Sequence, residues 1–177
     1  FARLLAPLLK PDDLVWVHDY HLMPLASELR ALGCQQRIGF FLHIPLPPPM
    51  ILAAIPGHDW LVRSLCAFDV VGFQSETDHQ HFCGYIEHEA KAQSLGEGRW
   101  RVFNRTLHAG AWPIGIDVEE LEALAKAPEA RDMHARMRRE YSRRMLLVGV
   151  DRLDYSKGLP QRMRAFRHLL PRHPETH

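Results

Sequence analysis

Short runs of consecutive apolar residues are the feature that most limits how this chain can fold. The runs are "LVWV" at 14–17, "IGFFLH" at 38–43 and "DVVGFQ" at 69–74, and stretches of helical character separate them. Strands that are buried on both faces of a parallel sheet read as continuous apolar runs rather than as alternating ones. The pattern therefore predicts an α/β fold in which helices cover both faces of a parallel sheet.

The helical segments have clear starting signals. We predict helices at 22–32, 75–92 and 118–127, and a helical stretch that ends near Cys66. Ser75 lies three residues before Asp78, a spacing at which a side chain caps the first turn of a helix. Asp117 and Glu120 repeat that spacing at the start of the last of these helices.

Three further segments are predicted around these helices. We expect 93–109 to form a loop with an irregular strand, 111–117 to resume the sheet, and "MLLVGV" at 145–150 to be another strand. Trp16, Trp60, Trp100 and Trp112 are interpreted as packing residues.

A shift to polar and basic composition between Ala127 and Arg144 indicates a domain boundary. We assign residues 1–127 to one domain and 128–177 to the start of a second one. One strand and one helix are too little to close a core, so we expect the chain to be a piece of a larger protein.

The overall composition argues against several classes of function. Of the 177 residues 46% are hydrophobic, and 22 basic against 21 acidic side chains give a net charge of +1. This balance favours neither nucleic acid nor a membrane surface as a partner. The three cysteines form no CxxC pair, and we interpret them as reduced thiols of a cytoplasmic protein. No apolar run approaches the roughly 18 residues of a membrane span.

The first polar strand end is "VHDYHL" at 17–22, where an apolar run leads into His18, Asp19 and His21. Ligands of open α/β sheets bind outside the carboxyl ends of the strands, so Asp19 is a candidate binding residue. Two alternatives stay open here: a metal site that includes His18 and His21, and a structural role in which Asp19 only caps the following helix.

The second strand end is "FFLHIPLPPP" at 40–49, where the strand ends at His43. The prolines that follow hold the exit of the strand extended, which would place His43 reproducibly. The alternative is a histidine of the core that is hydrogen-bonded to backbone.

The third strand end lies in "VGVDRLDYSKGLPQRMRAF" at 148–166. Arg152 and Lys157 lie five residues apart before the helix that follows Gly158, and two cations beside a helix N-terminus suit a diphosphate. Alternatively, Asp151 and Asp154 pair with these two cations at the surface. The arginines of the basic run "RMRREYSRR" at 136–144 fall on several faces of a helix, so the run is interpreted as a solvated helix rather than as a nucleic-acid patch.

Taken together, five motifs resemble the trehalose-6-phosphate synthase family, the glucosyltransferases that join UDP-glucose to glucose 6-phosphate. The motifs are "VWVHDYHLMPLASELR", "IGFFLHIPLPPP", "LCAFDVVGFQSETD", "WPIGID" and "VDRLDYSKGLPQRMRAF". The resemblance implies a GT-B architecture, in which two Rossmann-like domains face a cleft. Residues 1–127 would be the C-terminal portion of the acceptor domain, and 128–177 the truncated start of the nucleotide-sugar domain.

The resemblance also implies roles for the residues at the three strand ends. Asp19 would bind glucose 6-phosphate, and His43 with Ile44 would contact the transferred glucosyl unit. Arg152 and Lys157 would hold the diphosphate of UDP. The implied reaction retains the α configuration and yields α,α-trehalose 6-phosphate and UDP. It needs no cofactor or metal, in line with the lack of an Asp-x-Asp signature, and His43 receives no defined acid or base role.

Other expectations concern the whole enzyme. The resemblance implies a cytoplasmic homo-oligomer with small-molecule substrates and with neither nucleic acid nor membrane as partner. Much of the acceptor pocket would lie outside these 177 residues, so we expect the chain alone to be inactive. Two alternatives stay open: a glucosylglycerol-phosphate synthase, and a catalytically silent homologue that binds sugar phosphates and regulates. Met50 stands where members of the family often have Glu.

Overall fold

The computed structural model describes residues 1–142 and 146–174, and it forms two compact units, Phe1–Gly115 and Ile116–His177. The division falls before the boundary that composition places after residue 127. The domain boundary after residue 127 stays a prediction.

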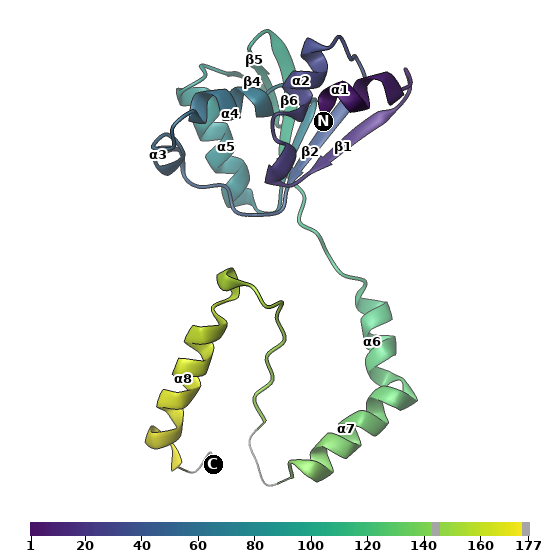
Figure 1. Ribbon diagram of the computed structural model, residues 1–177, viewed down its shortest axis with the longest axis vertical. Helices are drawn as coiled ribbons and strands as arrows, with labels where there is room; N and C mark the ends of the chain where they lie inside the picture. Colours follow the sequence, from purple (N-terminus) through teal and green to yellow (C-terminus); the bar gives the residue numbers. More distant parts are fainter. Residues whose placement is uncertain (143–145, 175–177) are drawn as a thin grey trace. The chain divides into compact units, whose positions relative to one another are not determined.

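The first unit is built on a six-stranded sheet with the order β1-β2-β3-β6-β5-β4 (Figure 1). The strands are β1 (Leu14–His18), β2 (Arg37–Leu42), β3 (Val70–Phe73), β4 (Gln93–Gly96), β5 (Arg99–Val102) and β6 (Arg105–Ala111). The first four in the spatial order are parallel, and β5 and β4 add an antiparallel edge. The predicted α/β class with a mostly parallel sheet is confirmed.

Two short helices of this unit precede β1 in the sequence, and the others lie between successive strands. The helices are α1 (Ala2–Leu5), η1 (Ala6–Leu8), η2 (Tyr20–Leu22), α2 (Leu25–Ala31), α3 (Pro49–Leu52), α4 (His58–Leu65) and α5 (Glu76–His88). The predicted helix at 22–32 begins only at Leu25, because Pro24 occupies its N-cap. The cap predicted for α5 is confirmed, since the Ser75 hydroxyl accepts a hydrogen bond from the backbone N–H of Asp78 at 3.1 Å.

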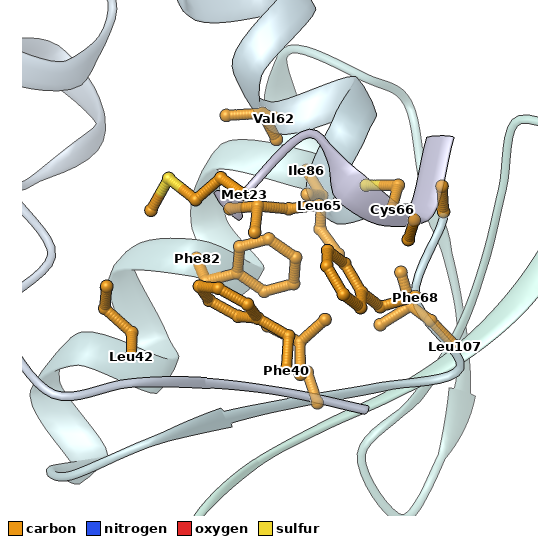
Figure 2. Close-up of a cluster of buried hydrophobic side chains, with 14 of the residues drawn as sticks. Met23, Phe40, Leu42, Val62, Leu65, Cys66, Phe68, Phe82, Ile86 and Leu107 are labelled. Atoms are coloured by element: carbon orange, nitrogen blue, oxygen red, sulfur yellow. The ribbon is translucent and has the colours of Figure 1, made fainter. Parts of the chain in front are cut away.

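One hydrophobic core lies between the sheet and α2, α4 and α5. Phe40 of β2, Phe68 and Phe82 of α5 gather at its centre, as Figure 2 shows, and the rings of Phe40 and Phe68 are tilted by 43° with centroids 5.1 Å apart. Aliphatic side chains from the surrounding elements complete this core: Met23, Leu42, Val62, Leu65, Ile86 and Leu107. Side chains on the helix-facing side of the strands thus pack with those of the helices in a single core.

Asp69 connects the opposite, amino-terminal ends of the strands. Its carboxylate accepts hydrogen bonds from Arg30 at 2.9 Å, from Arg105 at 3.1 Å and from the backbone N–H of Ile38 at 2.8 Å. Its own backbone N–H donates to the carbonyl of Ile38. A single carboxylate therefore links α2, β2 and β6 where the parallel strands begin.

The helices cover one face of the sheet, because every crossover moves in the same direction along it and right-handed crossovers then place their helices together. The other face carries Trp16 and Trp112, whose indoles lie over Gly39 and Gly110 and stay 51% and 43% exposed. The prediction of helices on both faces is therefore wrong within residues 1–115.

Two other predictions need correction in this unit. Residues 93–111 form three strands rather than a loop with one irregular strand, and the sheet ends at Ala111 instead of resuming at 111–117. The polar β4, and β5 with its two arginines, lie at the antiparallel edge, where one face can be solvated and the continuous apolar pattern is not needed. Of the four tryptophans only Trp100 is buried, and Trp60 is 55% exposed.

The second unit contains α6 (Val118–Lys126), α7 (Pro128–Glu140), η3 (Tyr155–Lys157) and α8 (Leu159–Arg172). The predicted cap of α6 is confirmed, because the Asp117 carboxylate accepts from the backbone N–H of Glu120 at 2.9 Å. The basic helix α7 is largely exposed, as predicted, although residues 143–144 of the basic run lie outside the described residues.

The strand predicted at 145–150 is wrong for residues 146–150, which form no strand, while residue 145 lies outside the described residues. A strand needs a neighbour to pair with, and the second unit contains none within residues 116–142 and 146–174. Leu147 and Val150 are accordingly 62% and 88% exposed. Across the described residues no helix is both long and apolar enough to cross a membrane.

The three cysteines are free thiols, which agrees with the reading from composition. Burial raises the pKa of the Cys66 thiol from 9.0 to about 12 and that of Cys83 to about 11, each partly offset by a neighbouring group. The Cys66 thiol loses its proton at a lower pH in the unfolded chain than in the folded one. Its contribution to folding stability is therefore lost as the pH rises from 9.0 towards about 12.

We therefore predict that iodoacetamide leaves Cys66 unmodified in the native protein between pH 8 and about 10, since the thiolate is the nucleophile. The same residue should react readily in urea, which serves as the control. Mass spectrometry of alkylated peptides gives both rates. Equal rates in native and unfolded protein would contradict the buried position of Cys66.

Candidate functional site

The carboxyl ends of β1 and β2 lie side by side at one edge of the sheet. His18 of β1 is paired with Phe41 of β2, and the backbone N–H of Asp19 donates to the carbonyl of Phe41 at 2.8 Å. Paired residues of parallel strands share a face, and His43 lies two residues beyond Phe41, so His18 and His43 point to the same side. The two strand ends predicted from sequence are thus one place in the structure.

Asp19 has a backbone conformation that is uncommon for any residue other than glycine. Its φ of 63° and ψ of 176° lie in a sparsely populated region, and such strain is often kept at functional sites. Its Oδ1 is buried without a hydrogen-bond partner among the described residues. The capping alternative is wrong, because the Asp19 side chain makes no capping hydrogen bond to η2. A carboxylate oxygen that lacks a partner can accept a hydrogen bond from a ligand hydroxyl.

His43 is exposed, and its ring meets the ring of His18. The distance between His18 Nδ1 and His43 Nε2 is 2.9 Å, and Phe41 packs against His43 with ring centroids 4.9 Å apart. The alternative of a core histidine bonded to backbone is therefore wrong. Ile44 follows at the start of the proline-rich loop and is 43% exposed.

The loop that carries His43 and Ile44 is anchored to α5 through Leu46. The backbone N–H of Leu46 donates to Asp78 Oδ1 at 2.9 Å, and its carbonyl accepts from His81 Nδ1 at 2.8 Å. The Ser75 hydroxyl donates to the other oxygen of Asp78 at 2.6 Å. Sequence reasoning predicted Ser75 and Asp78 as a cap but missed the loop anchor, because the contact spans 32 residues.

Arg152 and Lys157 lie in the second unit around the short helix η3. Arg152 is 81% exposed and approaches Asp154 at 3.6 Å, while Lys157 ends η3 beside Gly158. Asp154 caps η3, since its carboxylate accepts from the backbone N–H and the hydroxyl of Ser156, each at 2.9 Å. These hydrogen bonds, and secondarily the two cations, hold the pKa of Asp154 below its usual range.

Gly158 lets the chain turn directly from η3 into α8. Its φ of 63° is favourable for glycine, and α8 begins at the next residue. The first backbone N–H groups of a helix lack internal partners and carry partial positive charge. Lys157 therefore adjoins a helix N-terminus, a combination that suits an anionic phosphate.

The alternative in which Asp151 and Asp154 pair with Arg152 and Lys157 is confirmed for one of the two acidic residues. Asp154 approaches Arg152, but Asp151 binds Arg162 of α8, with 2.6 Å between Asp151 Oδ2 and Arg162 Nη2. Within residues 116–142 and 146–174, Lys157 makes no ion pair. The sequence contains no local signal for Arg162, because it lies eleven residues from its partner and is brought back by the turn at Gly158.

The metal alternative at the first strand end receives no support. His18 contacts His43, whereas His21 stacks on Tyr20 with ring centroids 4.1 Å apart. No group of three possible ligands converges in the ranges 1–142 and 146–174.

Comparison with known proteins shows the family to which the chain belongs. The family model of Glycosyltransferase family 20 matches residues 1–177, and the chain belongs to this family. The particular relatives are trehalose-6-phosphate synthases. That of Sinorhizobium fredii is 45% identical over 174 residues, which cover 98% of this chain and 38% of the relative.

Two solved structures agree with this assignment. The UDP-forming α,α-trehalose-phosphate synthase of Burkholderia xenovorans in complex with glucose 6-phosphate is 49% identical, with a TM-score of 0.83 over 96% of this chain and 38% of that one. The Escherichia coli structure bound with UDP-2-fluoro glucose is 39% identical, with a TM-score of 0.87 over 99% and 39%. The chain thus spans 38% of the length of the first curated relative that it matches.

Replacing Asp78 tests the anchor of the loop. We predict that Asp78→Ala lowers the free energy of unfolding by about 1–3 kcal/mol, because the backbone N–H of buried Leu46 loses its acceptor. Asp78→Asn keeps an acceptor and should recover part of the loss. Urea denaturation followed by fluorescence measures the effect.

The control is Glu87→Ala, an exposed position of the same helix, which should change stability by at most about 0.5 kcal/mol. An Asp78→Ala variant as stable as this control would show that Asp78 does not hold the loop.

Proposed function

We propose that the full-length protein transfers glucose from UDP-glucose to glucose 6-phosphate with retention, yielding α,α-trehalose 6-phosphate and UDP. The observation that carries this proposal is the 45% identity to a trehalose-6-phosphate synthase across 98% of the chain. Solved relatives that hold glucose 6-phosphate or a UDP-glucose analogue support the same pair of substrates.

The acceptor is assigned to Asp19. Its strained backbone holds the carboxylate at the strand end, and the partnerless Oδ1 can accept a hydrogen bond from a hydroxyl of glucose 6-phosphate. Because a carboxylate would repel the phosphate group, Asp19 suits the sugar end of the acceptor.

The transferred glucosyl unit is assigned to His43 and Ile44. The anchored loop presents an imidazole, which can hydrogen-bond a sugar hydroxyl, next to an exposed aliphatic side chain that can pack on the sugar. His43 binds and orients in this proposal. It is given no acid or base role, because no observation shows it facing a reacting oxygen.

The diphosphate of UDP is assigned to Arg152, Lys157 and the N-terminus of α8. The weak 3.6 Å contact with Asp154 leaves Arg152 available to a phosphate, and Lys157 is unpaired within the described ranges of the second unit. Arginine can bind a phosphate through two parallel hydrogen bonds, whereas lysine acts as a point charge.

The chemistry follows from where charge develops. As the bond between glucose and UDP breaks, negative charge grows on the leaving phosphate and the sugar becomes oxocarbenium-like. Fixed cations at the diphosphate stabilise this transition state more than the ground state. The leaving phosphate can accept the proton of the attacking hydroxyl on the same face of the sugar, which accounts for retention without a carboxylate nucleophile. The proposal includes no metal or other cofactor.

The protein acts in the cytoplasm as a homo-oligomer on small-molecule substrates, with no nucleic-acid or membrane partner. Free thiols support the location, and a near-neutral net charge supports small molecules over nucleic acid or a membrane surface. The homo-oligomer is carried over from the family resemblance.

The test of the proposal is UDP release by the full-length protein, given UDP-glucose and one of two acceptors. Release with glucose 6-phosphate and not with glycerol 3-phosphate is the expected result. Release with glycerol 3-phosphate alone would identify a glucosylglycerol-phosphate synthase, and release with neither would favour a silent sugar-phosphate-binding homologue.

For the diphosphate site, we predict that Arg152→Ala lowers kcat by roughly 10²- to 10³-fold, as expected for the loss of one charge contact in the transition state. Lys157→Ala should act in the same direction. The matched control is Arg139→Ala, an exposed arginine of α7, which should keep wild-type kinetics. Unchanged kcat in Arg152→Ala would remove Arg152 from the diphosphate site.

A further inference from the structure

We propose that His18 is a positioning residue, which fixes the ring orientation and the tautomer of His43. The inference rests on the proposed function, because His18 has this task only if His43 contacts the transferred glucosyl unit. In this proposal His18 contacts no substrate and acts only through His43.

Strand geometry brings the two rings together. The parallel register and the two-residue repeat of a strand place both side chains on one face, and the hydrogen bond between His18 Nδ1 and His43 Nε2 is 2.9 Å long. The ring centroids are 5.2 Å apart, while Trp16 lies against His18 at 5.8 Å. The ring of His43 packs on Phe41 with centroids 4.9 Å apart, so each ring contacts an aromatic side chain two residues earlier and reaches the other ring through one nitrogen.

The hydrogen bond couples the protons of the two rings. A neutral imidazole carries one N–H, so one of the two facing nitrogens donates and the other accepts. If His18 Nδ1 donates, the proton of His43 lies on its Nδ1; if His43 Nε2 donates, its Nδ1 is bare. The two rings hence share the same tautomer, so the hydrogen bond links the tautomer of His18 to whether His43 Nδ1 offers a sugar hydroxyl a donor or an acceptor.

The sheet itself does not need this contact. Backbone hydrogen bonds already join β1 to β2 along the whole of β1, and the bond from Asp19 to Phe41 extends them beyond the last strand residue. Both histidines are exposed, so burial does not fix their rings. The hydrogen bond to His18 therefore favours one orientation of the His43 ring over the others that an exposed imidazole can adopt.

The chain offers a graded set of variants for the test. His18→Asn keeps a polar group where Nδ1 lies, His18→Gln moves that group to the place of Nε2, and His18→Phe keeps only a flat ring. His88→Asn, at the exposed C-terminal end of α5, is the matched control for loss of an imidazole.

In the full-length protein, we expect His18→Phe and His18→Gln to lower kcat by about 10- to 100-fold, as small misplacements of a contacting group do. His18→Asn should recover most of this loss, and the KM for glucose 6-phosphate should change little in all three variants. His88→Asn should keep wild-type kinetics. A purely structural role for His18 would instead give equal losses in the three variants, which would overturn the proposal.

A second readout is independent of turnover. The ¹⁵N chemical shifts of the His43 ring in the substrate-free protein report which nitrogen carries the proton. We expect one bare and one protonated nitrogen in the wild type and in His18→Asn, and averaged shifts in His18→Phe. Unchanged shifts in His18→Phe, alongside normal wild-type turnover, would overturn the role of His18 alone. Absence of wild-type turnover would overturn the proposed function, and with it the task given to His18.

Discussion

Parallel hydrogen bonding between β1, β2, β3 and β6 is the constraint on which the rest of the first unit depends. Because all four strands run the same way, their carboxyl ends meet at one edge, and Asp69 closes the opposite edge with two arginines and a backbone N–H. The uniform direction of the crossovers also places the helices on one face, where the core forms. The polar strand ends therefore gather at the edge that such sheets use for ligands.

The site depends equally on a contact between distant parts of the sequence. Helix α5 packs on the sheet and, through Asp78 and His81, holds both backbone groups of Leu46. That anchor fixes the chain just after β2, and His43, three residues before Leu46, contacts the ring of His18. In the second unit the turn at Gly158 has a comparable effect, because it returns Arg162 to Asp151 and leaves Lys157 beside the start of α8.

Local signals predicted what local interactions decide. The strand ends at Asp19 and His43, and the caps at Ser75 and Asp117, follow from short stretches of sequence and agree with the structure. The roles of Asp78 and Arg162 could not be predicted, since their partners lie 32 and 11 residues away. The apolar stretch 146–150 was misread as a strand because composition reveals apolar character but not whether a neighbour is present. The substrate roles of Asp19, His43, Arg152 and Lys157 came from the family resemblance and stay predictions.

The configuration of the product tests the central claim most directly. The full-length protein would be incubated with UDP-glucose labelled with ¹³C at C1 and with glucose 6-phosphate, and the product would be analysed by NMR. The account predicts a labelled anomeric carbon in an α,α-1,1 linkage, with the phosphate retained on the other glucose. A β-linked product, or label that stays in UDP-glucose or appears only in free glucose, would contradict it.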